Sequence, residues 1–291
     1  MWPSSEQDTV LVYNRVPKAG STFMTELLHD LSKKQNHFNL AFATTEVRPG
    51  GEELPRLLRD LPNGTAWVRH AGFWDAAPAH FAWINIVRDP LERFRSLYDM
   101  YAATGLSKPS HRQSVKEIQR NYAALANDAA CGCWNTSFNA CITTSVERNC
   151  SLCIPSQIAF FCPPDDVDGV DSGHGNFRLC DVPRPNCTVQ KALHRLRTRY
   201  KAVGLEEQMH ASVELFEHLL PRFFAGATAR AASMTARSNP LPMGTRSSGV
   251  SQSVRALLMG AGNFAAEQLF YHAAKLEFVK ALREAQLPQT T

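Results

Sequence analysis

Short apolar segments that alternate with helical patterns in the first hundred residues restrict the fold most strongly. Residues 9–16 (TVLVYNRV), 65–73 (TAWVRHAGF) and 81–90 (FAWINIVRDP) are rich in β-branched and aromatic residues, as buried strands are. Helical spacing of apolar residues begins at Ser21 and again over 91–103. Strands that alternate with helices form a mainly parallel sheet flanked by helices. The sequence therefore predicts an α/β fold.

The rest of the chain divides into an irregular part and a helical part. From about 104 to 190 the sequence is rich in Cys, Asn, Ser, Pro and Asp, which predicts an irregular insertion. Residues 225–252 are expected to form a loop. With 291 residues, 44% of them hydrophobic, the chain can bury a sizeable core, and we expect one domain over 1–291. Further helices are expected over 51–61, 189–200, 204–224 and 265–285.

The eight cysteines all lie between Cys131 and Cys187. An even number in a loop-rich segment predicts a local disulfide framework and an oxidising compartment. Zinc is the alternative, because Cys150 and Cys153 form a CxxC pair, but no second pair accompanies them at zinc-finger spacing. Four Asn-X-Ser/Thr patterns also match the glycosylation acceptor of secretory proteins. They begin at Asn63, Asn135, Asn149 and Asn186.

Charge and hydropathy indicate the setting. The chain contains no run of about 18 apolar residues that would predict a membrane-spanning helix, and Met1 does not begin a signal peptide pattern. We therefore expect a lumenal domain whose membrane anchor is absent from this chain. The net charge of +4, from 31 Lys and Arg against 27 Asp and Glu, is too small to indicate nucleic-acid binding. A local basic cleft for an anionic ligand is compatible with it.

The first predicted strand ends in a polar motif, which reads PKAGST. A strand that turns tightly into a helix directs several backbone N–H groups to one point, and this arrangement suits an anion. Gly20 allows close approach, Lys18 adds a positive charge, and Ser21 and Thr22 can cap the helix or donate to phosphate oxygens. The Walker pattern GxxxxGK[ST] is not met, because Lys18 precedes the glycine. A capped helix with a solvated lysine is the simpler interpretation.

A second junction of the same kind follows residues 81–90. This strand delivers Arg88 to its carboxyl end, where open α/β sheets bind ligands, and arginine suits bidentate recognition of phosphate. Ser96 lies in the first turns of the next helix. A local Arg88–Asp89 ion pair is the alternative. Two strand-to-helix junctions that each carry a cation and hydroxyls favour phosphate binding.

The segment Tyr13–Thr22, followed 70 positions after Lys18 by Arg88 in INIVRDPLERFRSLY, resembles the uronyl 2-O-sulfotransferases. That family includes heparan sulfate and dermatan/chondroitin uronyl 2-O-sulfotransferases. The stretches VRHAGF, LLPRFFAGAT and EQLFYHAAKLEF agree in order, so the resemblance covers roughly 10–280 and fails mainly in the cysteine-rich third and in 229–260. It implies a P-loop-like sulfotransferase fold with a disulfide-rich insertion. It also implies 3′-phosphoadenosine 5′-phosphosulfate as the sulfate donor, with no metal.

The resemblance further implies roles for individual residues. His70 matches the catalytic base, and histidine is the side chain whose usual pKa lies nearest neutrality. Lys18 is expected to stabilise the charge that develops on the leaving phosphate, and Arg15 matches a contact to the uronic acid of the acceptor. Arg112 is a further acceptor candidate, in a region with fewer basic residues than the family has. The residues implied to hold the donor are Lys18, Ala19, Gly20, Ser21 and Thr22 for the phosphosulfate, Arg88 and Ser96 for the 3′-phosphate, and Arg237 and Ser238 in a loop that closes over the nucleotide.

Together these features predict in-line transfer of a sulfuryl group from that donor to a hydroxyl, with a histidine base. The expected acceptor is the 2-OH of a uronic acid in a glycosaminoglycan-like polysaccharide, and the expected setting is the Golgi lumen, as a type II membrane protein. A homotrimer is expected from the resemblance alone. Two alternatives remain. One is a secreted module that binds sulfated polysaccharide without catalysis. The other is a phosphate-loop kinase, which would need a Walker lysine and a magnesium-binding carboxylate.

Overall fold

A parallel sheet forms the centre of the computed structural model, which describes residues 9–34, 36, 38–42, 53–107, 136–148, 156–163, 167–168, 182–183, 187–234, 249–260 and 264–288. The sheet has five strands in the order β2-β3-β1-β4-β7, and every neighbouring pair is parallel. This confirms the predicted α/β class. The strands are β1 (Val10–Asn14), β2 (Asn39–Phe42), β3 (Thr65–Arg69), β4 (Phe81–Val87) and β7 (Tyr200–Leu205).

Burial explains why three of these strands could be recognised in the sequence. β1, β3 and β4 are buried along their whole length, as expected for parallel strands covered on both faces. β1 lies between the other two, with Val12 opposite Trp67 on one side and Trp83 on the other. Four polar side chains interrupt this apolar pattern and are buried as well: Asn14, Thr65, Arg69 and Asn85.

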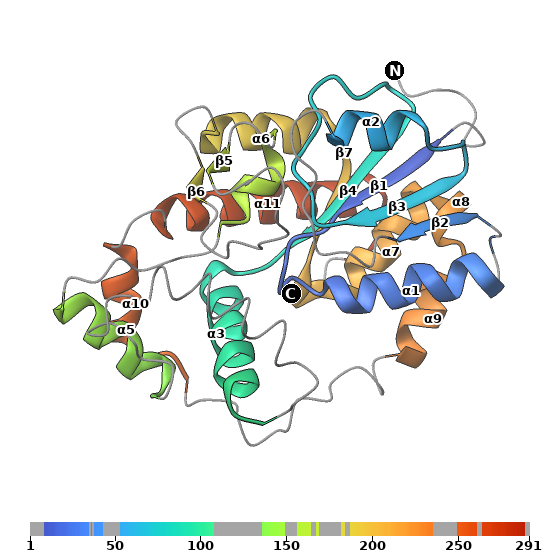
Figure 1. The fold of residues 1–291 in the computed structure, drawn as a ribbon. Coiled ribbons are helices and arrows are strands. Elements are labelled where there is room, and N and C mark those ends of the chain that lie inside the picture. Colours follow the sequence, from blue (N-terminus) through green and yellow to red (C-terminus); the bar gives the residue numbers. More distant parts are fainter. Residues whose placement is uncertain are drawn as a thin grey trace.

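Helices cover both faces of the sheet (Figure 1). On one face lies a group whose members contact one another: α1 (Ser21–Lys34), α7 (Met209–Leu219), α8 (Pro221–Phe224) and α9 (Ala227–Met234). On the other lie α2 (Glu53–Arg59) and α6 (Val189–Thr198). The long helix α11 (Phe264–Glu284) packs against both α6 and β7.

A second hydrophobic cluster stands apart from the sheet, at the lower left of Figure 1. It is built by α3 (Pro90–Ser107), α5 (Phe138–Glu147) and α10 (Gln252–Met259). The Phe138 ring lies edge-on to those of Phe94 and Tyr98, each with centroids 5.4 Å apart. Because α3 starts directly after β4, this cluster begins at the carboxyl edge of the sheet.

Several predicted element bounds were wrong. The expected loop over 225–252 contains α9 and the start of α10, and the alanines of ATARAASM explain the helix, since alanine is the best helix former. The expected helices over 189–200 and 204–224 give way between them to β7. The strand expected over 65–73 ends at Arg69, and β2 was not expected.

Part of the cysteine-rich insertion belongs to the core. Residues 156–162 are buried and include a short 3-10 helix, η3 (Ile158–Phe161), while β5 (Val167–Asp168) and β6 (Val182–Pro183) form a small antiparallel pair. Cys162 is bonded to Cys187, which confirms a disulfide in the insertion, and Cys141 is also in a disulfide. The single-domain assignment stays a prediction. Across the part of the chain that the structure describes, no helix is both long and apolar enough to span a bilayer.

Candidate functional site

Four strand ends bring the candidate residues to one edge of the sheet. Arg15 follows β1, His70 follows β3, Arg88 follows β4 and Glu206 follows β7. Because all strands are parallel, these residues share the carboxyl edge, where ligands bind in open α/β sheets. The structure therefore places His70, Arg88 and the loop after β1 on the same side of the molecule.

The loop between β1 and α1 is tightly turned. Lys18 has a φ of 62° and Gly20 a φ of 73°, both in the left-handed region that non-glycine residues rarely adopt. The Gly20 carbonyl accepts from the Met24 N–H at 3.2 Å, so α1 begins here. Ala19 is buried, Ser21 is half-buried and Thr22 is exposed. The first N–H groups of α1 lack intrahelical acceptors, as in every helix, and a bound anion can supply them.

Arg88 links this loop to the next strand end. Its Nη1 donates to the Lys18 carbonyl at 3.2 Å. Burial and the neighbouring Arg88 guanidinium lower the pKa of Lys18, while Asp99 and Glu206 oppose that shift. Two cations are thus held close together in a partly buried place, and a bound polyanion would relieve the repulsion between them.

The three residues Arg88, Asp89 and Pro90 have different structural roles. The Asp89 carboxylate caps α3 by accepting from the N–H groups of Leu91 at 2.9 Å and Glu92 at 3.1 Å, and Pro90 occupies the first helical position. The Arg88 Nε lies 3.4 Å from Glu206 Oε2. Arg88 therefore forms its ion pair with Glu206, which follows β7, whereas the alternative from the sequence was a local ion pair with Asp89. Burial raises the pKa of Glu206, although Arg88 acts against this.

Ser96 lies on α3, on the helix face that also carries Asp99. It is half-buried and stands three residues before Asp99. Asp99 and Lys18 each influence the pKa of the other, which places this face near Lys18. Burial is the largest effect on Asp99 and raises its pKa.

His70 is oriented by a backbone carbonyl. Its Nδ1 lies 2.8 Å from the Arg15 carbonyl oxygen, which can only accept, so Nδ1 carries the hydrogen of the neutral ring. The lone pair of that ring is then at Nε2, as a general base requires. The ring also meets Phe160 edge-on, with centroids 6.4 Å apart. Beside it Arg69 is buried, and burial lowers its pKa against the influence of Glu53.

Arg15 lies between the carboxyl edge of the sheet and a surface cavity. Its N–H donates to the Arg69 carbonyl at 2.9 Å, and its guanidinium lies 5.3 Å from the centre of the Phe42 ring. Phe42 also lines a cavity of about 520 Å³. The Asp30–Arg230 ion pair lies in the lining of the same cavity. Space for a ligand thus begins next to Arg15.

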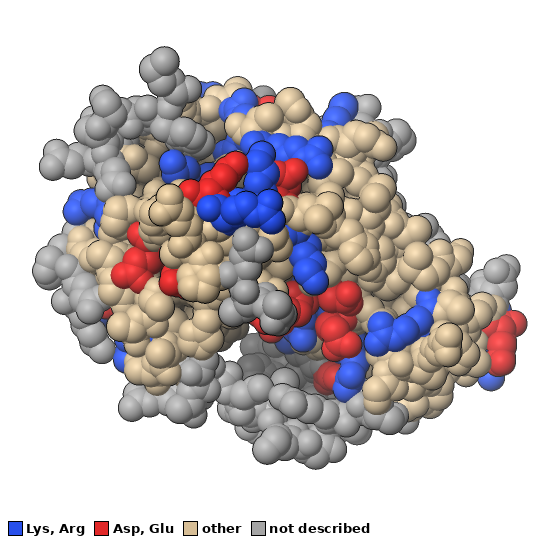
Figure 2. Space-filling model, turned by 180° about the vertical axis from the view of Figure 1, so that it is seen from behind, with Lys and Arg blue, Asp and Glu red and all other residues tan. Residues whose placement is uncertain are grey.

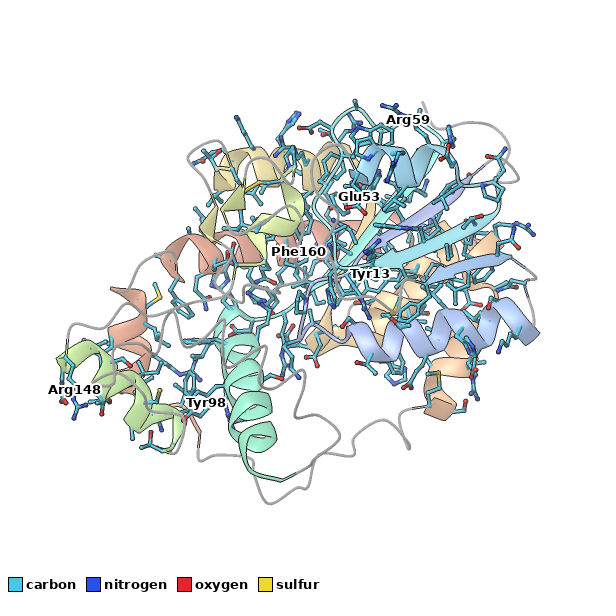
Figure 3. The ribbon with its side chains drawn as sticks, in the orientation of Figure 1. Tyr13, Glu53, Arg59, Tyr98, Arg148 and Phe160 are labelled. Carbon is cyan, nitrogen blue, oxygen red and sulfur yellow. A yellow bond between two sulfur atoms is a disulfide. The ribbon has the colours of Figure 1, made fainter. Side chains whose placement is uncertain are left out.

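A buried network that the sequence analysis missed supports this edge. Asn14 Nδ2 donates to the Phe160 carbonyl at 2.7 Å and to the Tyr200 hydroxyl at 2.9 Å, and Asn85 Nδ2 donates to the Asn14 carbonyl at 2.8 Å. Tyr13 and Phe160 lie near the middle of the molecule, whereas Tyr98 and Arg148 lie in the separate helical cluster (Figure 3). The sequence did contain a signal for this network, because Asn14 and Asn85 each lie in a strand of mostly apolar residues.

Three predicted positions, Arg112, Arg237 and Ser238, lie outside the described residues, as do Cys150 and Cys153. Among the residues that the structure describes, no group of three His, Cys, Asp or Glu side chains is arranged to hold a metal ion.

The face seen from behind carries mixed charge (Figure 2). Lys and Arg atoms lie beside Asp and Glu atoms rather than forming one uniformly basic surface. Ion pairs between elements, such as Arg197–Glu277 at 2.7 Å and Arg195–Asp75 at 2.6 Å, agree with the small net charge. Any anion site in the described residues therefore depends on local geometry, as at Lys18 and Arg88.

Comparison with known proteins identifies the family. A family model described as "Sulfotransferase family" matches residues 5–151, just over half of the 291 residues. The chain belongs to the sulfotransferase family. The matched segment of this sulfotransferase contains the loop with Lys18, the strand end with His70 and the strand end with Arg88.

Individual relatives are more specific. Heparan sulfate 2-O-sulfotransferase 1 of Homo sapiens is 28% identical over 239 residues, which is 77% of this chain and 58% of that protein. The Xenopus laevis protein of that name is 26% identical over 294 residues (95% and 73%), and heparin sulfate O-sulfotransferase of Drosophila melanogaster is 27% identical over 235 (76% and 58%). This sulfotransferase thus spans 58% of the length of the human relative. The resemblance to uronyl 2-O-sulfotransferases is confirmed.

Proposed function

We propose that this chain transfers a sulfuryl group from 3′-phosphoadenosine 5′-phosphosulfate to the 2-OH of a uronic acid in a glycosaminoglycan-like polysaccharide. One observation carries the proposal: three strand ends are joined at one edge. Arg88 donates to the Lys18 carbonyl at 3.2 Å, and His70 lies 2.8 Å from the Arg15 carbonyl. Membership of the sulfotransferase family and the heparan sulfate relatives support the donor and the acceptor class.

The residues present fit an anionic donor. Lys18 and Arg88 are both partly buried and lie close enough for Arg88 to disfavour the charged form of Lys18. Bound donor would supply the sulfuryl group and a phosphate leaving group. We assign its phosphosulfate to the loop Lys18–Thr22 and its 3′-phosphate to Arg88 and Ser96.

His70 and Lys18 carry the chemistry of the proposed step. His70 Nε2 takes the proton of the sugar hydroxyl as the hydroxyl oxygen forms its bond to sulfur. The bond from sulfur to the 5′-phosphate oxygen breaks, and its electron pair stays on that oxygen. Lys18 and the first N–H groups of α1 stabilise the charge that builds there, as preorganised cations and dipoles do in phosphoryl transfer.

Arg15 and the compartment complete the proposal. Arg15 would pair with the carboxylate of the uronic acid, and the cavity beside Phe42 leaves room for the chain of the polysaccharide. A Golgi lumen location is supported by the Cys162–Cys187 disulfide, since such bonds persist in oxidising compartments. The homotrimer stays an expectation from the resemblance.

Calorimetric titration with adenosine 3′,5′-bisphosphate, without magnesium, tests the donor site. Wild type should bind saturably, and Arg88→Ala should weaken binding by about tenfold to a hundredfold, because charged hydrogen bonds are lost. Arg197→Ala removes an exposed arginine on α6 and is the control. His70→Ala should keep nucleotide binding and lose sulfate transfer to a desulfated polysaccharide. Absence of binding by folded, disulfide-intact wild type would reject the transferase and favour the polysaccharide-binding module.

A further inference from the structure

The backbone of Arg88 is held by a buried amide side chain. The sheet register between β4 and β7 ends at Val87–Leu205, so Arg88 lies just beyond the ladder. Beyond the ladder, the Gln157 side chain supplies the hydrogen bonds: its Oε1 accepts from the Arg88 N–H at 3.2 Å, and its Nε2 donates to the Arg88 carbonyl at 2.9 Å. Gln157 is fully buried. One side chain therefore fixes both polar groups of the Arg88 backbone.

Gln157 is itself held from α11. The Glu267 carboxylate is fully buried, and its Oε2 accepts from the Gln157 N–H at 2.9 Å. Its Oε1 accepts from the Ser156 hydroxyl at 2.5 Å and from the Ile158 N–H at 3.4 Å. Burial raises the pKa of Glu267, and the nearby Arg93 opposes this. A buried carboxylate with several donors is costly to displace, so it fixes the segment that carries Gln157.

A second chain of contacts runs from α11 to the next peptide group. The Tyr271 hydroxyl donates to Glu207 Oε2 at 3.1 Å, and Glu207 Oε1 accepts from the Asp89 N–H at 2.7 Å. Glu267 and Tyr271 are four residues apart, on one face of α11. Two consecutive residues, Arg88 and Asp89, are thus anchored through different intermediates to one turn of one helix.

We propose that α11 positions Arg88 for the 3′-phosphate of the donor, with Gln157 and Tyr271 as the positioning residues. This inference rests on the proposed function. A turn beyond a strand end is freer than the strand itself, and a guanidinium fork binds phosphate well only when its direction is fixed. Arg88 also meets the Lys18 carbonyl and Glu206, so a shift of its backbone would disturb the two halves of the donor site together.

Selectivity for the 3′-phosphate tests the inference. We would measure, by calorimetry, the ratio of the Kd of adenosine 5′-phosphate to that of adenosine 3′,5′-bisphosphate. Gln157→Met removes both amide contacts at similar volume, and Tyr271→Phe removes only a hydroxyl. We expect this ratio to fall about tenfold in the first and about threefold in the second, with 5′-phosphate affinity unchanged. In an Arg88→Ala background neither change should lower it further.

Matched controls separate positioning from general loosening. Gln268→Met changes a half-buried glutamine on α11, and Tyr98→Phe removes a hydroxyl that donates to the Thr136 carbonyl, away from the Arg88–Asp89 turn. Neither should change the ratio. If Gln157→Met does not fold, Tyr271→Phe carries the test.

The outcomes distinguish the two proposals. Loss of 3′-phosphate selectivity in the positioning variants alone supports the inference. A wild type that prefers the bisphosphate, with variants that keep this preference or weaken both nucleotides equally, overturns the inference and leaves the proposed function standing. Wild type that binds neither nucleotide rejects the proposed function, and the positioning role with it.

Discussion

At the residue scale, Arg88 has a carboxylate beside it where a phosphate is proposed to bind. Its Nε lies 3.4 Å from Glu206, whose side chain is 28% exposed. Like charges repel, so Glu206 must either turn away or take up a proton when the 3′-phosphate arrives. This residue therefore sets a cost on donor binding that depends on pH.

Glu206→Gln should tighten binding of adenosine 3′,5′-bisphosphate about fivefold at pH 7. The change removes one negative charge next to the phosphate, an effect of about 1 kcal/mol for partly exposed charges. Calorimetry of the two proteins in the same buffer measures it. Glu214→Gln, which neutralises another half-buried glutamate on α7, is the control. Equal affinities of Glu206→Gln and wild type would show that Glu206 does not face the phosphate.

The sign of the pH dependence follows from the pKa of Glu206. Burial raises this pKa in the free protein, and a bound phosphate would raise it further, so the complex holds more protons than the free protein. Affinity of wild type relative to Glu206→Gln should therefore rise as pH falls through the raised pKa. The ratio of the two affinities, measured from pH 7.5 down to about 5, cancels the titration of the phosphate itself, whose second pKa is about 6.

The sequence predicted those candidate residues that belong to a local motif. It did not predict residues whose role depends on contacts with distant parts of the chain. Lys18 and Arg88 each follow an apolar strand, and the structure places both at one sheet edge. Gln157 lies in an insertion without a regular pattern, and Glu267 lies in a helix that looked like ordinary core. Their importance depends on contacts across 69 and 110 residues of sequence, which no local pattern encodes.

At the scale of elements, the loop before α1 depends on Gly20. Gly20→Ala should destabilise the fold by about 1–2 kcal/mol and weaken nucleotide binding, because φ is 73° and a Cβ would overlap the Cε of Met209. Chemical denaturation and calorimetry measure both effects. Gly249→Ala is the control, since a Cβ there meets nothing within 4 Å. Adding Met209→Ala should relieve the overlap and leave the backbone strain. Full recovery in that double variant would refute the strain.

Element prediction succeeded where burial was complete and failed where it was not. β1, β3 and β4 are buried throughout and read as apolar runs. β2 has only four residues, none of them buried, so nothing marked it as a strand. β7 reads YKAVGL, so Lys201 and Gly204 interrupt its apolar run, and it lies between two helical patterns. Its place in the sheet is determined by pairing with β4.

At the scale of the whole molecule, the Cys162–Cys187 disulfide joins the buried segment after η3 to the start of α6. It closes a separation of 25 residues, and a loop of that size predicts a stabilisation of about 3.5 kcal/mol. Replacing both cysteines by alanine should lower the free energy of unfolding by about that amount, measured with urea under oxidising conditions. Under reducing conditions the difference should nearly vanish. A difference that persists would mean that packing, rather than the cross-link, is responsible.

The contacts from α11 also affect the order in which the parts of the site can fold during synthesis. Lys18 precedes Glu206 by 188 residues and Tyr271 by 253 residues, so the loop with Lys18 is synthesised well before both. Domains complete their folding only when their long-range partners have been synthesised. A chain that still lacks α11 therefore has the loop with Lys18 but not the helix that we propose positions Arg88. The proposed nucleotide site should therefore mature only after α11 has been synthesised, so shorter partial products would not sequester the donor.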